Sequence, residues 1–447
     1  MATVLLSTLI PQSSQAWLSG ASRQHRILSS SLRGRSVSSL TAWGQTTTSR
    51  TTTGTENESE SLSSSDGKDR RPNFTIYYND VYEVKLPPNH RFPMEKYGKV
   101  RRRVQDYVMN KQQQPSSSSS SVVISCPFQV SPLATVTELE TTHDPQYIQR
   151  YLRGDMTDAE VRNVGFPWSP AGVNRSLSSV GGTVAAARHV VEQIMARRAA
   201  TTTTTSSNTT TSTTTTTTNH GSQSTSALSW AAHVAGGTHH AFYDYGEGFC
   251  VFSDIAVAAN VVLKEYAHVV RRILILDLDV HQGNGNAILF QNRPEVFTFS
   301  MQCAANSFSP KEVSDLDIEL PVDCRDETYL LTLKHWLSRI QQEAGEFDLV
   351  FFQAGVDGLA DDRLGRMALT AQGLARRNEM VYDFCLQQNL PLVITMGGGY
   401  PRKDWEPILA AHAAVYTGAY DFLAQVASST TLQQDAETPD DVSVLQA

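Results

Sequence analysis

The chain has 447 residues and a formal net charge of −8 at pH 7, so its electrostatics give no reason to expect direct binding of nucleic acid. Its five cysteines are an odd number without a CxxC pair, which indicates a reducing compartment and argues against a disulfide framework or a thiolate zinc site. No apolar run approaches the length that spans a bilayer, so we expect no membrane span. The sequence leaves the oligomeric state open.

Low-complexity segments divide the chain. Residues 1–73 are rich in Ser, Thr and Arg, segments 111–121 and 201–226 are Gln/Ser-rich and Thr/Ser-rich insertions, and residues 426–447 form an acidic tail. Such compositions bury too little apolar surface to offset the entropy of ordering the chain. We therefore predict that these segments are disordered and that residues 74–425 form one large α/β domain.

The N-terminus carries a candidate targeting signal. The first 55 residues contain five arginines and no acidic residue, as is typical of transit peptides for a mitochondrion or plastid. The short apolar run at residues 4–10 would instead suit a weak signal sequence for a two-step route into a complex plastid. A plain disordered tail, which would leave the protein in the nucleus or cytoplasm, is the other alternative.

In the first part of the predicted domain, FTIYY at residues 74–78 is typical of a strand, and a helix is expected to run to about residue 109. Asp144 and Pro145 suit the first turn of a further helix. A long amphipathic helix is expected at about residues 173–198.

In the second part, strands and helices alternate. A strand is expected near residues 232–235, and Ser253 or Asp254 suits the N-cap of a helix with one apolar face. Further strands are predicted at residues 273–278, 296–300, 348–354 and 391–396, and helices near 327–343, 371–388 and 403–415. This alternation predicts an α/β fold with a mostly parallel sheet covered by helices on both faces. Right-handed crossovers place the carboxyl ends of the strands at one edge, where such folds bind ligands.

The most informative segment is ILILDLDVHQGNG at residues 273–285. A buried strand runs directly into Asp277, Asp279 and His281, and residues two apart on an extended segment point to the same face. Burying two carboxylates is costly unless a positive charge neutralises them, so a divalent metal ion is expected there. The spacing alone is equally compatible with a strand end that carries solvated acidic side chains.

Three more polar clusters follow predicted strands, so all four clusters should meet at one edge of the sheet. They are GGTHH at residues 236–240, AGVD at 354–357 and MGGGY at 396–400. Asp279, His281 and Asp357 then supply two carboxylates and one imidazole. This is a three-ligand site suited to zinc, with a position left for water or substrate.

The remaining side chains of these clusters supply the other groups that a hydrolase needs. His239 and His240 are acid and base candidates because imidazole titrates near neutral pH. Asp277 can orient one of them by accepting a hydrogen bond from the ring. Tyr400, presented by three glycines, is a candidate donor to an oxyanion. We therefore predict hydrolysis of an amide or ester.

The motifs GFPWSP, GGTHHAF, GEGFCVFSD, DLDVHQGNG, AGVDGLADDRLG and MGGGY occur in this order between residues 74 and 425. In the number and order of these motifs the chain resembles the zinc-dependent histone deacetylases of the arginase/deacetylase superfamily, most of all the class IV and bacterial deacetylase-like proteins. The resemblance implies the three-layer fold of that superfamily, zinc as cofactor, and removal of acetyl or longer acyl groups from lysines of histones or other proteins.

The resemblance also implies a role for each site residue, with the three-ligand set as the zinc site. His240 would be the general base and then the acid, while His239, oriented by Asp277, would lie near the leaving amine. Tyr400 would donate a hydrogen bond to the acyl oxygen.

Substrate and potassium contacts are implied in the same way. Gly248, Phe249 and Gly399 would contact the acyl-lysine in a narrow channel. Asp277 and Ser300 would take part in binding a structural potassium ion.

One position departs from the class I pattern. Where class I enzymes have an aspartate beside the second histidine, this chain has Asn284. An amide accepts a hydrogen bond without carrying charge, so we expect His240 to be less basic than it would be beside a carboxylate. Class IV relatives share this asparagine, and some of them prefer long fatty acyl groups. Deacylase therefore describes the expected activity better than deacetylase.

Other functions were weighed against this one. An amidohydrolase of small acetylated amines such as acetylpolyamines would use the same polar groups, so the motifs do not separate it from a protein deacylase. A non-catalytic acyl-lysine reader is disfavoured because every catalytic position is filled. An arginase-like manganese pair is disfavoured because Gln282, Gly283 and Gly358 stand where further carboxylates would be needed. The acidic pair Asp361 and Asp362 is predicted to be solvated.

Overall fold

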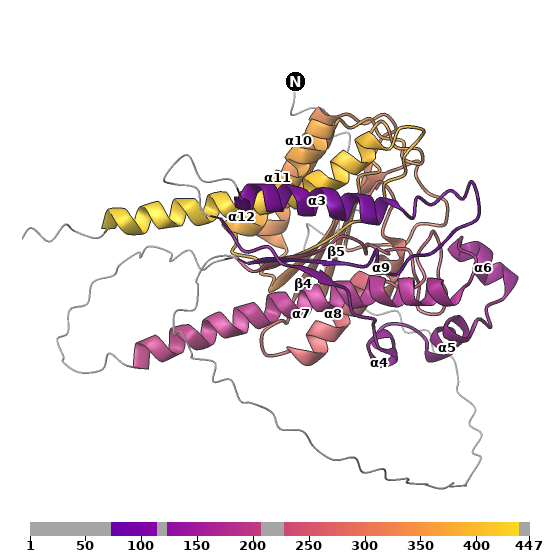
Figure 1. The fold of residues 1–447 in the computed structure, drawn as a ribbon, viewed down its shortest axis with the longest axis horizontal. Coiled ribbons are helices and arrows are strands. Elements are labelled where there is room, and N and C mark those ends of the chain that lie inside the picture. The colour runs from indigo at the N-terminus through magenta and orange to yellow at the C-terminus, as the bar shows by residue number, and fades with distance from the viewer. Residues whose placement is uncertain (1–72, 114–122, 207–227, 438–447) are drawn as a thin grey trace, which may run out of the picture.

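The computed structural model describes residues 73–113, 123–206 and 228–437 (Figure 1). The candidate targeting signal, most of both predicted insertions and the last ten residues lie outside this part of the chain. The described strands are β1 (Phe74–Tyr78), β2 (Phe128–Val130), β3 (Trp230–His233), β4 (Ile273–Asp277), β5 (Val296–Cys303), β6 (Leu316–Leu320), β7 (Leu349–Gln353) and β8 (Leu392–Thr395). The described helices are α3 (Lys96–Gln113), α4 (Val136–Leu139), α5 (Pro145–Arg153), α6 (Asp158–Val164), α7 (Pro170–Ser206), α8 (Asp254–Glu265), α9 (Asn284–Leu289), α10 (Asp326–Glu343), α11 (Ala371–Gln387) and α12 (Glu406–Glu437).

The strands form one 8-stranded sheet in the order β2-β1-β3-β8-β7-β4-β5-β6. Every neighbouring pair is parallel, which confirms the predicted α/β fold. Because all strands run the same way, the segments that follow them emerge at one edge of the sheet.

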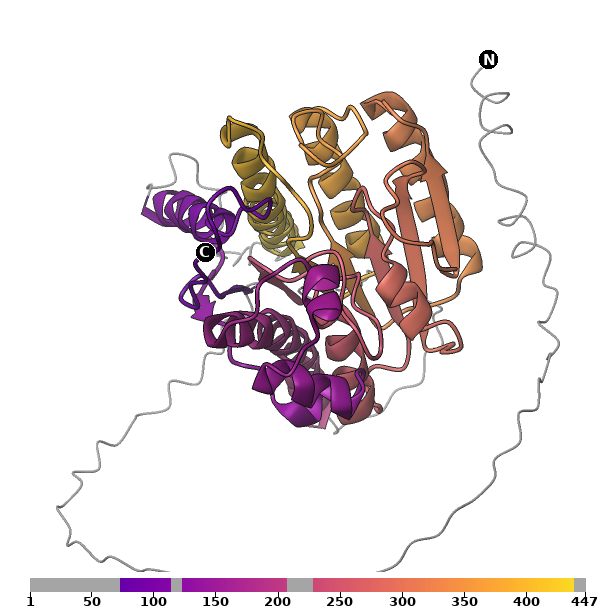
Figure 2. The ribbon, with the colours of Figure 1, turned by 90° about the vertical axis from the view of Figure 1, so that its right-hand side faces the viewer.

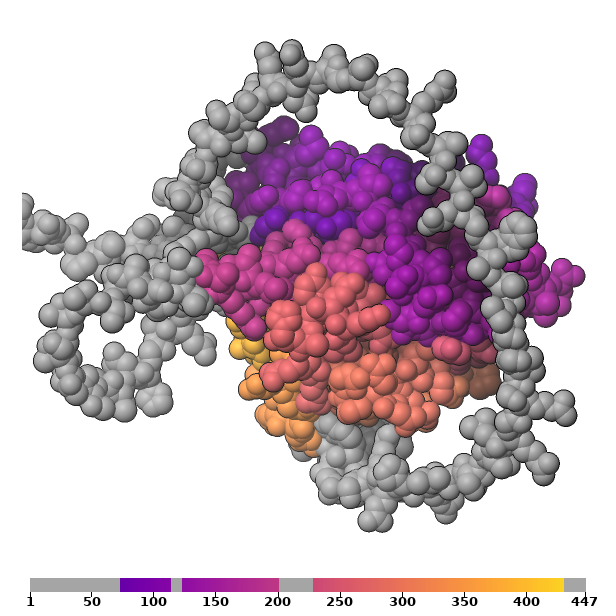
Figure 3. All heavy atoms as spheres, turned by 90° about the horizontal axis from the view of Figure 1, so that it is seen from below, coloured from indigo at the N-terminus to yellow at the C-terminus, as the bar shows by residue number. Residues whose placement is uncertain are grey.

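Helices cover both faces of this sheet. Helices α3, α10, α11 and α12 contribute to the apolar core on one face, and α7 and α8 contribute to the core on the other (Figure 1). Viewed from the right-hand side of Figure 1, the two groups of helices lie on opposite sides of the strands (Figure 2). From below, the surfaces of α7 and α8 lie side by side (Figure 3). None of the described helices is long and apolar enough to cross a membrane.

Strand β4 lies between β7 and β5 and is buried over its whole length. The register places Asp277, its last residue, beside Gln353 of β7 and Ser300 of β5. An apolar strand buried on both faces therefore delivers the DLDVH segment to the middle of the carboxyl edge.

The predicted element bounds are wrong in a few places. Strands β2 and β6 were not predicted, since β2 has only three residues and β6 mixes charged with apolar side chains. Helix α7 continues to Ser206, into the predicted insertion at 201–226. Helix α12 continues to Glu437, so residues 426–437 are helical where a disordered tail was expected. The buried residues Tyr416, Tyr420, Leu423 and Ala427 extend its packed face beyond the predicted end at 415.

Candidate active site

The three candidate metal ligands meet at the carboxyl edge of the sheet. Asp279 and His281 follow β4, and Asp357 follows β7, which pairs with β4. One ligand atom of each lies within 4.8 Å of the others, and all three residues are buried. Backbone N–H groups orient both carboxylates: Val280 donates to Asp357 Oδ1 at 3.0 Å and Gly398 to Asp279 Oδ2 at 2.8 Å. Two carboxylates and one imidazole directed at one position fit a divalent cation such as zinc.

The electrostatics of this cluster also favour a bound positive charge. His281 Nδ1 lies 3.2 Å from Asp279 Oδ1 and 3.1 Å from Asp357 Oδ2. Burial disfavours the charged imidazole, but its hydrogen bonds with the two carboxylates outweigh this effect and raise the pKa of His281 to about 10. Burial also raises the pKa of Asp357, and the charge of Asp279 adds to that shift. Either protons or a metal ion must therefore compensate the buried carboxylates.

Asp277 does not join the ligand cluster. Strand β4 ends at this residue, and with it ends the two-residue alternation that predicted a common face for Asp277, Asp279 and His281. The carboxylate of Asp277 instead contacts His239, with 2.7 Å between Oδ2 and Nδ1. Its Oδ1 accepts from the backbone N–H of Asp279 at 3.1 Å.

The two neighbouring histidines follow β3 and have different environments. Their ring centroids lie 4.0 Å apart. Burial disfavours a charge on His239, but the carboxylates of Asp277 and Asp279 outweigh it and raise the pKa of His239 to about 9. Burial keeps the pKa of His240 well below its usual range, and the positive charges of His239 and His281 lower it further. His240 is thus the neutral imidazole of the pair.

Asn284 fixes the tautomer of His240. The amide Nδ2 of Asn284 donates to Glu247 Oε1 at 2.7 Å, and its Oδ1 accepts from the backbone N–H of Gly285 at 3.0 Å. Since Oδ1 is the acceptor, the contact of 2.7 Å with His240 Nδ1 is donated by the ring. His240 Nε2 therefore carries the lone pair and can accept a proton.

Tyr400 is held in a buried loop after β8. Burial raises the pKa of its phenol well above the usual value, and nearby Asp357 adds to this shift, so the group is a stable hydrogen-bond donor. Lys96 Nζ donates to the carbonyl oxygens of Gly397 and Gly399, both at 3.2 Å. Gly398 must be glycine, because a Cβ there would overlap Asp357 Oδ2.

Aromatic rings line the approach to these groups. Gly248 and Phe249 both have left-handed backbone angles, with φ of 58° and 69°, and the Phe249 ring packs against Phe166 at 5.3 Å between centroids. Phe308 packs edge-on against His240 and His281, at 4.8 and 5.9 Å between centroids. The Phe308 side chain is 55% exposed, so it stands between the candidate catalytic groups and solvent.

Sequence reasoning missed four residues that contact this site: Glu247, Phe308, Lys96 and Asp362. Phe308 has a recognisable signal, because it belongs to the loop after the predicted strand at 296–300. For Glu247 and Lys96 nothing in the local sequence indicates the contact. Asp362 was predicted to be solvated, but it is fully buried, whereas Asp361 is exposed.

Ser300 and Asp277, which the resemblance links to a potassium ion, are neighbours in the sheet. Ser300 stands beside Asp277 in the β4–β5 register. Among the described residues its buried hydroxyl has no hydrogen-bond partner. An orphaned buried oxygen of this kind fits a cation that binds through oxygen atoms.

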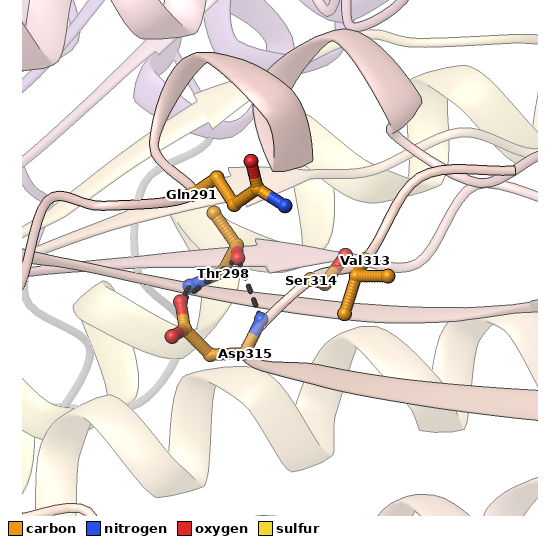
Figure 4. Close-up of a pocket in the computed structure, with 5 residues that line it drawn as sticks. All are labelled: Gln291, Thr298, Val313, Ser314 and Asp315. Carbon is orange, nitrogen blue, oxygen red and sulfur yellow. Dashed lines mark hydrogen bonds between the residues drawn. The ribbon is translucent and has the colours of Figure 1, made fainter. Parts of the chain in front are cut away.

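A second cavity, of about 250 Å³, lies at the β5–β6 end of the sheet, away from the candidate ligands (Figure 4). Its one carboxylate, Asp315, accepts hydrogen bonds at 2.9 Å from both the N–H and the hydroxyl of Thr298. These bonds link β5 to the residue that precedes β6.

Comparisons with known proteins place these observations in a family. The model for the histone deacetylase domain matches residues 97–416. An uncharacterized protein of Picosynechococcus is 36% identical over 78% of the chain and 99% of its own length. Histone deacetylase 2 of Arabidopsis thaliana is 30% identical over 39% of the chain, and histone deacetylase clr6 of Schizosaccharomyces pombe is 34% identical over 40%. The matched regions span 45% and 44% of those two proteins.

Proposed function

Because the chain belongs to the histone deacetylase family, we propose that it hydrolyses acetyl or longer acyl amides on lysines of histones or other proteins. The observation that supports this most directly is the buried Asp279–His281–Asp357 cluster at the sheet edge that also carries the two histidines. Zinc is the proposed ion, since two carboxylates and one imidazole leave positions for water and substrate. Bound there, it supplies Lewis acidity toward the acyl carbonyl and water.

The protein groups have distinct proposed roles. His240 Nε2 takes a proton from the attacking water and later gives it to the departing lysine amine. His239, held by Asp277, stabilises negative charge beside it. Tyr400 donates its phenolic hydrogen to the acyl oxygen as charge develops there.

The channel has its own proposed contacts. Gly248 and Phe249 form one wall around the lysine side chain, and Gly399 is the third proposed contact of the acyl-lysine. Phe308 forms the opposite wall. The hydrogen bond from His240 to Asn284, rather than to an aspartate, supports a class IV assignment.

The test is turnover of a lysine peptide that carries acyl groups of increasing length, from acetyl to myristoyl. We expect amide hydrolysis by the zinc-loaded protein, none after chelation, and none in His240→Ala. Absence of hydrolysis on every acyl peptide, with zinc bound, would contradict the proposal. Far faster turnover of free acetylpolyamines than of peptides would favour the small-amine amidohydrolase instead, and acyl-peptide binding without turnover would favour a reader.

We also propose a potassium site at Asp277 and Ser300, supported by the orphaned hydroxyl of Ser300. Thermal unfolding in potassium and in sodium chloride of equal ionic strength tests it. The wild-type protein should be more stable in potassium, and Ser300→Ala should lose most of that difference. If the difference in melting temperature between potassium and sodium chloride is the same for the wild-type protein and Ser300→Ala, the potassium assignment is wrong.

For localisation we propose a mitochondrial or plastid address in the first 70 residues, supported by five arginines and no acidic residue among the first 55. Imaging these residues fused to a fluorescent protein tests it. A matched fusion with all five arginines replaced by glutamine should lose the organelle signal. Diffuse nuclear and cytoplasmic fluorescence of the native fusion would contradict the proposal.

A further inference from the structure

Asp362 is a fully buried carboxylate that the proposed chemistry does not use. It follows a turn in which its N–H donates to the carbonyl oxygen of Leu359 at 2.9 Å. In the described part of the chain no ion pair is recorded for its carboxylate; Arg402 Nη2 donates instead to the backbone carbonyl oxygen of Asp362, at 2.8 Å. A buried charge without a cationic partner must be stabilised by hydrogen bonds, and all of those recorded for its carboxylate come from the backbone.

The backbone donors come from two separate segments. Oδ1 accepts from the N–H groups of Leu364 and Gly365, at 2.7 and 2.8 Å. Oδ2 accepts from the N–H of Tyr400 at 2.6 Å. The carboxylate thus joins the turn after Asp357 to the loop that carries the proposed oxyanion donor.

A second hydrogen bond connects the same turn to the backbone of Tyr400. The N–H of Arg363, the next residue, donates to the carbonyl oxygen of Tyr400 at 2.9 Å. Residues 362 and 363 therefore hold both the N–H and the C=O of Tyr400, which fixes the position of its Cα and the direction of its side chain.

Tyr400 needs such a tether because of what precedes it. Gly397, Gly398 and Gly399 give the backbone unusual freedom, and Gly397 adopts a φ of 68°. Lys96 and Asp279 bind groups of these glycines. The contact of Lys96 with the Gly399 oxygen reaches the peptide unit that carries the Tyr400 N–H, but neither residue contacts the C=O of Tyr400. A donor displaced by about 1 Å loses on the order of 100-fold in rate.

We propose that Asp362 is a positioning residue: its Oδ2 holds the backbone N–H of Tyr400 while its Oδ1 is anchored by Leu364 and Gly365, so that the phenol of Tyr400 reaches the acyl oxygen. This inference rests on the proposed function, which makes Tyr400 the donor. This positioning role requires a carboxylate at residue 362. An asparagine has only one acceptor oxygen, so its NH₂ group would face a backbone N–H donor where the second carboxylate oxygen now accepts. The contact acts through the backbone of Tyr400, so its effect should vanish when the phenol is absent.

The test is a double-mutant cycle on the acyl-lysine peptide, with Asp362→Asn, Tyr400→Phe and the combined variant. We expect Asp362→Asn to lower kcat about 10- to 100-fold with KM within about twofold. In the Tyr400→Phe background it should cause no further loss, because the interaction it supports is already gone. The exposed neighbour provides the matched control, and Asp361→Asn should leave kcat unchanged.

Equal losses from Asp362→Asn in both backgrounds would show a general structural role and overturn the inference while leaving the proposed function intact. Equal turnover by the wild-type protein and Tyr400→Phe would overturn the inference together with the proposed role of Tyr400, whereas absence of hydrolysis by the wild-type protein would contradict the proposed function itself. Zinc content and thermal unfolding of each variant are measured in parallel. If Asp362→Asn does not fold, Asp362→Glu enters the same cycle, since it keeps both acceptors but moves them by one methylene. It should again lower kcat only when Tyr400 is present.

Discussion

The side-chain amide of Asn284 bridges His240 and Glu247, with 2.7 Å on each side. Its oxygen faces the imidazole and its nitrogen faces the carboxylate. Glu247 is buried, so an aspartate at position 284 would place two carboxylates in direct contact. The asparagine is therefore matched to Glu247 as well as to the histidine.

This bridge predicts the pH dependence of a swapped pair. In Asn284→Asp combined with Glu247→Gln, a carboxylate faces His240 Nδ1 and the glutamine amide donates to it. A charged acceptor favours imidazolium, so the pKa of His240, which burial holds low, should rise by about one to three units. His240 must be neutral to act as the base. The acidic limb of the pH profile of kcat/KM should therefore move to higher pH by the same amount as the pKa of His240.

The single variant Asn284→Asp is the control for this experiment. Its new carboxylate shares a proton with Glu247, so its acidic limb should move less than in the swapped pair. A limb that stays in place in the swapped pair would show that Asn284 does not set the basicity of His240.

Metal removal should destabilise the protein in a pH-dependent way. In metal-free protein the pKa of His281 is raised to about 10. A raised histidine pKa gives stability that is complete below the unfolded value near 6.5 and is lost as pH rises toward 10. When the imidazole of His281 binds a metal ion it does not carry this titrating proton, so the metal-loaded protein does not lose this stability as the pH rises. The gap in melting temperature between metal-loaded and chelated protein should therefore widen from pH 6.5 to 9.

Thermal unfolding with and without a chelator measures this gap. At free metal about 100 times the Kd, the ion should add about 2.7 kcal/mol. Asp357→Asn removes one proposed carboxylate ligand and should shrink the effect of the chelator at every pH. A gap that is the same at pH 6.5 and pH 9 would contradict the assignment of His281 as a ligand that must lose its proton.

Gly365→Ala should unfold the site. A Cβ at this position would overlap the backbone carbonyl oxygen of Asp357, which cannot move without displacing a proposed metal ligand. We expect a loss of about 3 kcal/mol or more in unfolding free energy, together with weaker zinc binding. In Gly418→Ala on α12 the nearest atom would be 3.8 Å away, so this control should be neutral or up to about 1 kcal/mol more stable. Similar melting temperatures for both variants would contradict the prediction.

Gly248→Ala should narrow the channel. The added Cβ would lie 2.6 Å from Phe308 Cζ and 2.9 Å from His240 Cδ2, at a φ of 58°. Phe308 can swing toward solvent, but His240 is held by Asn284, so kcat/KM should fall about tenfold or more. Measuring kcat/KM of Gly248→Ala in a Phe308→Ala background tests this explanation. The added methyl group should lower kcat/KM less there than in the wild-type background. An equal cost in both backgrounds would assign the loss to backbone strain alone.

Much of the fold followed from local pattern. The alternation of apolar strands and amphipathic helices predicted the parallel sheet, and β4, β7 and β8 lie within a residue or two of their predicted bounds. Patterns were weakest where an element is short, as in β2, or where a helix continues through small and polar residues, as in α12. There the decision is made by packing against the rest of the domain.

In the candidate active site too, some residues could be predicted from the local sequence and others could not. Asp279, His281 and Asp357 could be singled out because each lies two to four residues after a strand whose apolar character is visible locally, and parallel strands end at one edge. Asp361 and Asp362 could not be told apart, since two adjacent acids look alike in sequence. Only the loop after β8, folding back to within hydrogen-bond reach, buries one of them.

The sequence by itself determined which residue types stand at the carboxyl ends of the strands, because strand periodicity is a local property of the chain. Tertiary structure alone decided which of the loop residues touch one another: Glu247 with Asn284, Phe308 with His240, and Asp362 with Tyr400. Those contacts join segments far apart along the chain, and whether a polar loop side chain is solvated or buried depends on the neighbours that packing brings to it.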